Sequence, residues 1–112
     1  MGKRGFLGEF EQIVLLALAR LGPDAYGMTI HDEIEKTIER SVSITAVYVT
    51  LSRLEKKGYV STQLGEPSPE RGGRAKRYFK LQPAGVTALK QSRNFLVRLW
   101  EGVQLDAEAG NR

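Results

Sequence analysis

Few residues of this 112-residue chain could carry out covalent or metal chemistry. The sequence contains one histidine, His31, and no cysteine. Without cysteine the chain has no disulfide, no thiol nucleophile and no cysteine-ligated zinc site, and one histidine does not make a metal-binding cluster. It has no glycine-rich phosphate loop and no nucleophile elbow. The sequence therefore predicts a protein that is not an enzyme and needs no cofactor or metal, with His31 as a partly exposed surface side chain.

The basic residues are the side chains of this sequence that could bind a partner, because of their charge and their positions. The whole chain carries a net charge of +4. Residues 40–80 contain nine Lys and Arg against three Glu, a local charge of +6, whereas the remainder carries −2. Because Lys and Arg neutralise phosphates, this basic middle favours a polyanion such as double-stranded DNA as the partner. A solvated basic surface explains the charge alone equally well.

Hydrophobic periodicity predicts the elements that position this charge. Apolar residues recur at helical spacing in three early segments, and two short segments rich in β-branched and aromatic residues then flank a loop rich in Gly and Pro. A longer helix begins near Pro83. The expected helices span residues 8–21, 27–39, 44–57 and 82–104, and the expected strands span residues 59–64 and 76–81. The predicted fold class is mainly α with a small β-hairpin.

Three helices followed by a two-stranded hairpin are the element order of a winged helix-turn-helix. In such a fold the third helix and the hairpin, or wing, face DNA, and both carry the positive charge of this chain. We expect residues 1–81 to form a winged helix-turn-helix DNA-binding domain, residues 82–104 a C-terminal dimerisation helix and residues 105–112 a flexible tail.

The third predicted helix has one apolar stripe for the core and an opposite face of short side chains for a partner. Short side chains allow close approach to a DNA groove, and we expect base edges and thymine methyls to be contacted by Thr45, Ala46, Val49 and Thr50. Phosphates are expected to be contacted by Ser43, Tyr48, Arg53 and Lys57, and from the hairpin by Arg71, Arg74 and Lys76. Structural alternatives stay open for three of these residues: Thr45 as a helix cap, Tyr48 as a core-edge aromatic and Val49 as a contact of the wing.

The last predicted helix is too long for its apolar side to be covered by so small a domain. At 1.5 Å per residue it spans about 30 Å, and Leu89, Leu96 and Val103 are spaced by seven, which favours packing against a second copy. With help from the first helix, the predicted homodimer interface comprises Phe10, Val14, Leu89, Leu96, Leu99, Trp100 and Val103. Trp100 either packs in this interface or stacks a small aromatic effector.

Four motifs in order cover the chain from about residue 7 to residue 103. They are Ile-Val-Leu-Leu-Ala-Leu at 13–18, Tyr26-Gly27-x-x-Ile30, Val47-Tyr48-x-x-Leu51-x-Arg53-Leu54-Glu55-Lys56-Lys57-Gly58, and Arg77-Tyr78-x-x-Leu81-x-Pro83-x-Gly85. With these motifs the chain resembles the PadR-like transcriptional regulators. The resemblance implies that Tyr48 is the characteristic tyrosine of the recognition helix, near the DNA backbone, and that Arg53 lies on the DNA-facing side.

The chain departs from the family pattern in two places. Gln82 stands where the family usually has a threonine helix cap, and the C-terminal region is a single helix, as in short members of the family. The first departure has little bearing on function. The second leaves little room for a separate effector domain.

These observations together predict a sequence-specific DNA-binding transcriptional regulator. We expect a homodimeric repressor that binds a pseudo-palindromic operator and is released by a small-molecule effector. The alternative is a protein-interaction module of the same fold whose basic face binds an acidic partner, and steep salt dependence would distinguish DNA binding from it.

The hydropathy of the sequence predicts a cytoplasmic protein. The longest apolar run, at residues 13–19, has seven residues, against about 20 for a membrane-spanning helix. The first residues carry two glutamates where a signal peptide would need an uninterrupted apolar segment.

Overall fold

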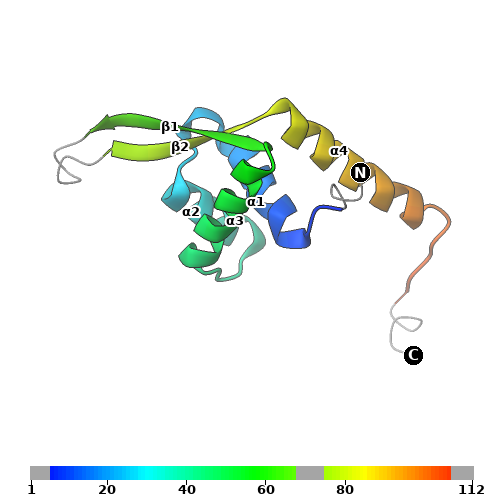
Figure 1. The fold of residues 1–112 in the computed structure, drawn as a ribbon. Coiled ribbons are helices and arrows are strands. Elements are labelled where there is room, and N and C mark those ends of the chain that lie inside the picture. The colour runs from blue at the N-terminus through cyan, green and yellow to red at the C-terminus, as the bar shows by residue number, and fades with distance from the viewer. Residues whose placement is uncertain (1–5, 68–74, 107–112) are drawn as a thin grey trace.

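The computed structural model describes residues 6–67 and 75–106. Its elements, in chain order, are α1 (Glu9–Leu21), the 3-10 turn η2 (Gly22–Asp24), α2 (Gly27–Ile38), α3 (Ile44–Lys56), β1 (Val60–Pro67), β2 (Ala75–Leu81) and α4 (Pro83–Trp100). Figure 1 shows α1, α2 and α3 gathered beneath the base of the hairpin. The predicted fold class, three helices and a two-stranded wing followed by a C-terminal helix, is confirmed.

Helix boundaries follow local signals in the sequence. The Ser43 side chain accepts a hydrogen bond from the Ala46 amide at 3.1 Å and so caps α3. Gly22, with φ of +61°, ends α1 just before Pro23. Pro83 occupies the first turn of α4, where its missing amide hydrogen has no helical partner to lose.

The core lies where α1, α2 and α3 meet the base of the hairpin. Its largest side chains with almost no exposed surface are Val14, Leu15, Leu18, Ile30, Ile34, Val47, Leu51 and Leu54. Phe79 of β2 and Val60 of β1 extend this core under the sheet. The apolar stripe predicted for α3 consists of Ile44, Val47, Leu51 and Leu54. Its last three residues are fully buried, and Ile44 is half-buried against the same core.

The hairpin is antiparallel and is also tied to the segment before α2. Val60 pairs with Leu81 and Gln63 with Tyr78, and the register shifts after Leu64. A further bridge joins Tyr26 to Tyr78. Next to it, the Phe79 amide donates to the Ala25 carbonyl at 2.8 Å. The chain entering α2 is therefore joined to β2 by a single β-bridge, and the sheet itself has two strands.

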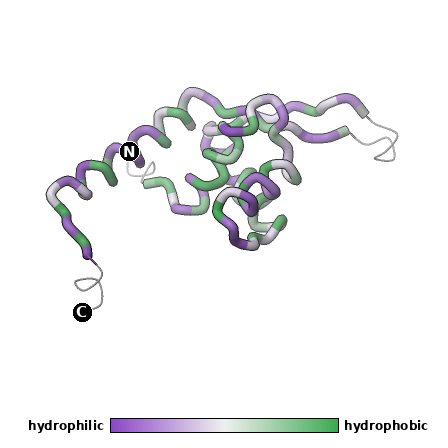
Figure 2. The backbone as a smooth tube through the Cα atoms, turned by 180° about the vertical axis from the view of Figure 1, so that it is seen from behind, coloured by the Kyte–Doolittle hydropathy of each residue, from purple (hydrophilic) through white to green (hydrophobic). Residues whose placement is uncertain are grey.

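The hairpin and α4 extend from opposite ends of an elongated molecule (Figure 1). The principal dimensions are 57 × 34 × 20 Å. Helix α4 contacts α1, and Figure 2 shows hydrophobic residues continuing along α4 beyond the helical body. The helix ends at Trp100, earlier than predicted, because Gly102 adopts φ of +79°. Val103 therefore does not continue the predicted spacing of seven along this helix.

None of the helices in the described ranges combines the length and hydropathy needed to span a membrane.

Candidate nucleic-acid interface

The outer face of α3 carries three of the residues predicted to contact DNA. Thr45, Val49 and Arg53 are exposed, and their spacing of four places them on one side of the helix. Ala46 is half-buried beside them, whereas Thr50 is 5% exposed. The prediction that Thr50 contacts bases is therefore wrong. Thr50 lies three residues after Val47 and belongs to the buried stripe.

Tyr48 lies where α3 crosses the start of α2. The side chain is 47% exposed, and its phenol ring lies directly over Gly27, the first residue of α2. A Cβ atom built on Gly27 would overlap the phenol oxygen and its ring carbon. The absence of a side chain at Gly27 thus leaves room for the ring, with about half of its surface open to a partner.

Lys57, predicted to hold a phosphate, is paired with the carboxylate of Glu11 on α1 while its own side chain stays 40% exposed. Its Nζ donates to Oε2 of Glu11 at 2.9 Å, and the Gly8 amide donates to Oε1 at 2.9 Å. Burial of the Glu11 carboxyl raises its pKa, but the bonds from Lys57 and Gly8 outweigh burial and hold the pKa below its ordinary value of 4.5. Lys57 therefore joins the end of α3 to the start of α1.

We expect Glu11→Gln to lower the free energy of unfolding by about 1–2 kcal/mol at neutral pH, because Lys57 loses its charged partner. The folded-state pKa of Glu11 lies below its unfolded value, so its ionised form stabilises the fold above about pH 4.5, and this contribution disappears as the pH falls through the folded-state pKa. Urea unfolding at about pH 7 and about pH 3 measures this, with exposed Glu9→Gln as the control. A deficit of the same size at both pH values would contradict the ion pair.

On the hairpin, the structure separates the predicted cations. Arg71 and Arg74 lie outside the described residues. Lys76 is turned back onto the protein: its Nζ is 3.2 Å from the Tyr26 hydroxyl and 4.3 Å from the centroid of the Tyr26 ring. This cation–π contact engages the Lys76 ammonium within the protein, and its phosphate contact stays a prediction.

Two exposed cations of β2, Arg77 and Lys80, were not among the predicted contacts. Arg77 donates from Nη1 to the Thr62 hydroxyl at 3.4 Å across the hairpin. Lys80 directly follows buried Phe79 and so lies on the opposite face of the strand, and this alternation is the signal that could have identified Lys80 as exposed. Arg77 lies two residues before Phe79 on the same face, so alternation gives no such signal for Arg77.

The predicted dimer residues divide between the core and the surface. Val14 is fully buried and so is covered within one chain, whereas Phe10 and Leu89 are half-buried against the same core. Leu96, Leu99 and Trp100 are 51%, 72% and 58% exposed. Val14 is therefore not available to a second copy, and the other interface residues stay a prediction. The periodicity of an apolar helix does not show which of its sides is covered within the chain.

Two further aromatic residues extend the exposed apolar part of α4. Phe95 is 39% exposed, and its ring meets the ring of Phe6 edge to face at a centroid distance of 5.6 Å. Neither residue was predicted to take part in an interface. Phe95 lies one position before Leu96, inside the predicted run of spacing seven, and this is the signal that could have pointed to it.

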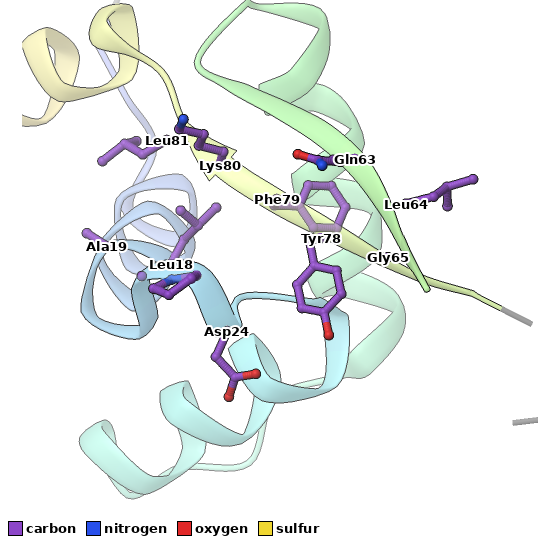
Figure 3. A pocket seen from close by; sticks show the side chains of 12 residues that line it. Leu18, Ala19, Asp24, Gln63, Leu64, Gly65, Tyr78, Phe79, Lys80 and Leu81 are labelled. Carbon is purple, nitrogen blue, oxygen red and sulfur yellow. The ribbon is translucent and has the colours of Figure 1, made fainter. Parts of the chain in front are cut away.

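A cavity of about 920 Å³ lies between the end of α1 and the hairpin. Figure 3 shows the Tyr78 ring extending from β2 toward the segment that carries Asp24. Trp100, the predicted platform for an effector, does not line this cavity. Within the described ranges, no group of three His, Asp or Glu side chains is placed to hold a metal ion.

Comparison with solved structures shows the same fold in several regulators. A transcriptional regulator from Clostridium thermocellum is 25% identical, with a TM-score of 0.67 over 81% of this chain and 85% of that one. A PadR-like transcription factor from Bacteroides fragilis is 24% identical, with a TM-score of 0.68 over 82% and 84%. A PadR family regulator from Clostridium difficile is 22% identical, with a TM-score of 0.62 over 84% and 96%.

A comparison with curated protein sequences gave no match. The family model described as "Transcriptional regulator PadR-like family", in contrast, matches residues 14–91. This range runs from α1 through the hairpin into α4 and covers more than half of the chain. The members of this family are DNA-binding transcription regulators and not enzymes. The chain therefore belongs to the PadR-like family of transcriptional regulators.

Proposed function

We propose that this protein binds a pseudo-palindromic operator as a homodimer and represses transcription by occupying the promoter. The observation that carries the proposal is the exposed row of Thr45, Val49 and Arg53 on α3, with Tyr48 half exposed beside it. Two short side chains followed by a guanidinium suit close approach to a major groove and its phosphates. The hairpin supplies Arg77 and Lys80 at the surface for backbone contact.

The far half of α4 is the proposed dimerisation surface. Leu96, Leu99 and Trp100 are more than half exposed there. Burying apolar side chains of this size against a second copy would stabilise a dimer. We therefore propose a DNA-binding unit at residues 1–81 and a dimerisation helix within residues 82–104. Two-fold symmetry then places two copies of α3 in grooves about 34–36 Å apart, or a multiple of that.

We extend the proposal to release by a small aromatic effector at the dimer seam. Trp100 is 58% exposed at the end of α4, and an indole ring stacks well on flat aromatic molecules. In a symmetric dimer each effector that stacks on Trp100 also touches the seam. Its binding would therefore change the angle between the two DNA-binding units.

Arg53→Ala tests the contact between α3 and DNA. We expect operator affinity to fall several-fold and the slope of log K against log salt to become shallower by about one, because one phosphate contact is lost. Fluorescence anisotropy with the DNA upstream of the gene itself, at four salt concentrations, gives both quantities. Lys90→Ala on α4 removes the same charge from an exposed position away from α3 and is the matched control. Equal slopes for the two variants would contradict the proposed role of Arg53.

A further inference from the structure

Both backbone polar groups of Val42 are held by side chains of α2. The Val42 amide donates to Oε2 of Glu35 at 2.9 Å, and the Val42 carbonyl lies 3.0 Å from Nε2 of His31. Val42 immediately precedes Ser43, the residue that caps α3. Glu35 follows His31 by four positions, so the two side chains reach the turn from adjacent positions on one face of α2. This pair therefore fixes the point at which the chain enters α3.

Three acceptors surround the His31 ring. Nδ1 lies 2.9 Å from Oδ1 of Asp32, and Nε2 lies 3.0 Å from the Val42 carbonyl and 3.3 Å from Oε2 of Glu35. A neutral imidazole carries one N–H and serves one side of the ring only, whereas the imidazolium donates from both nitrogens. Both ring nitrogens of His31 can therefore donate to these acceptors only when His31 is protonated.

The electrostatic surroundings favour the same state. The hydrogen bond to Asp32 raises the pKa of His31 above its ordinary value of 6.5, burial opposes this, and the Val42 carbonyl and the Glu35 and Asp32 charges add to the rise. The charged groups that face the ring are Asp32 and Glu35, both on α2, and the turn contributes the Val42 carbonyl. The His31 side chain is 15% exposed, so water screens these partners only in part.

We propose that His31 and Glu35 are positioning residues that hold α3 in its DNA-binding orientation, and that His31 makes operator affinity decrease as the pH rises from about 6 to about 8. The proposal rests on the proposed function, in which α3 contacts the operator. The contribution of protonated His31 to the turn is fully present below about pH 6.5 and is lost as the pH rises through the folded-state pKa. The sequence has one histidine and no cysteine, so no other side chain has an ordinary pKa in this range.

The test measures operator affinity at about pH 6 and about pH 8 for the wild type and for His31→Gln. Glutamine keeps a donor for the Val42 carbonyl but does not titrate. We expect the wild-type affinity to fall about threefold at the higher pH, because the protonated form of His31 is lost, and the His31→Gln affinity to stay constant. Urea unfolding without DNA should show the same contrast, because the turn is part of the folded protein.

The salt dependence distinguishes positioning from direct contact. If His31 acts through the turn, the slope of log K against log salt is the same at both pH values. A slope steeper by about one at the lower pH would show instead that the imidazolium itself neutralises a phosphate, and would overturn the positioning role. Operator binding that is independent of pH, or a pH effect that persists in His31→Gln, would also overturn it. Absence of operator binding at both pH values would overturn the proposed function as well.

The hydrogen bond between Glu35 and the Val42 amide is tested separately at about pH 6. Glu35→Gln keeps an acceptor for the Val42 amide, whereas Glu35→Ala removes it. We expect Glu35→Ala to lower operator affinity several-fold and Glu35→Gln to restore most of it, while unfolding in urea reports whether each variant is folded. Equal affinities for Glu35→Ala and the wild type would overturn the role of Glu35 in positioning α3.

Discussion

Leu96→Glu is expected to convert the protein to a monomer and to lower its operator affinity about 100-fold. Two linked DNA-binding units gain at least this factor over a single unit, because the second unit binds at a high effective concentration. A carboxylate placed at the centre of an apolar seam would have to be desolvated without a partner, which opposes association. Sedimentation velocity measures the first effect and anisotropy with operator DNA the second.

The folded protomer should tolerate this change. Leu96 is 51% exposed within one chain, so glutamate there remains in water and the free energy of unfolding of the monomer should change by less than about 0.5 kcal/mol. Asn94→Glu adds the same charge two residues earlier, on the opposite side of α4, and should leave the dimer intact. Leu96→Glu protein that still sediments as a dimer would refute the proposed seam.

Gly27→Ala is expected to lower operator affinity about tenfold through the displacement of Tyr48. The new methyl group would occupy the space of the phenol ring, and Tyr48 is half exposed, so the ring can swing away without opening the core. A hydrogen bond to a charged phosphate contributes about 1.5–3 kcal/mol, which corresponds to a tenfold or larger change in affinity. The free energy of unfolding should change little, because alanine also improves helix propensity at this position.

A double-mutant cycle assigns this effect to Tyr48. If Gly27→Ala acts through the ring, it has no further effect on affinity in a Tyr48→Ala background, and the double variant binds as Tyr48→Ala does. Gly8→Ala is the matched control, because a Cβ atom there meets only the Glu11 carboxylate at 3.7 Å. Affinity losses that simply add would show that Gly27 contributes by another route.

The elements of this fold could be predicted from the sequence because local chemistry defines most of their ends. Ser43 caps α3, Gly22 and Pro23 stop α1, and Pro83 begins α4, and each of these residues acts on its own neighbours in the chain. The end of α4 was missed because the backbone turns at Gly102 while apolar residues continue beyond it. Hydrophobic periodicity identifies a face but does not identify where the helix stops.

The candidate site was predicted less completely, because several side chains find partners far away in the sequence. Lys57 pairs with Glu11, which lies 46 residues earlier, and Lys76 contacts Tyr26, which lies 50 residues earlier. No local pattern distinguishes such a cation from one that is free to bind phosphate. Thr50 was a different kind of error, since its position in the buried stripe followed from helical spacing, but its polar side chain suggested exposure.

Because the hairpin and α4 lie at opposite ends of the protomer, a rotation at one end causes a larger displacement at the other. With the proposed seam at one end of a molecule 57 Å long and the wing at the other, a small rotation of α4 moves the wing much further than it moves α1. The bridge between Tyr26 and Tyr78 ties the wing to the start of α2, so the wing and α2 move together. A regulator built in this way could lose the spacing of its half-sites through a slight change at the seam while each DNA-binding unit keeps its internal structure.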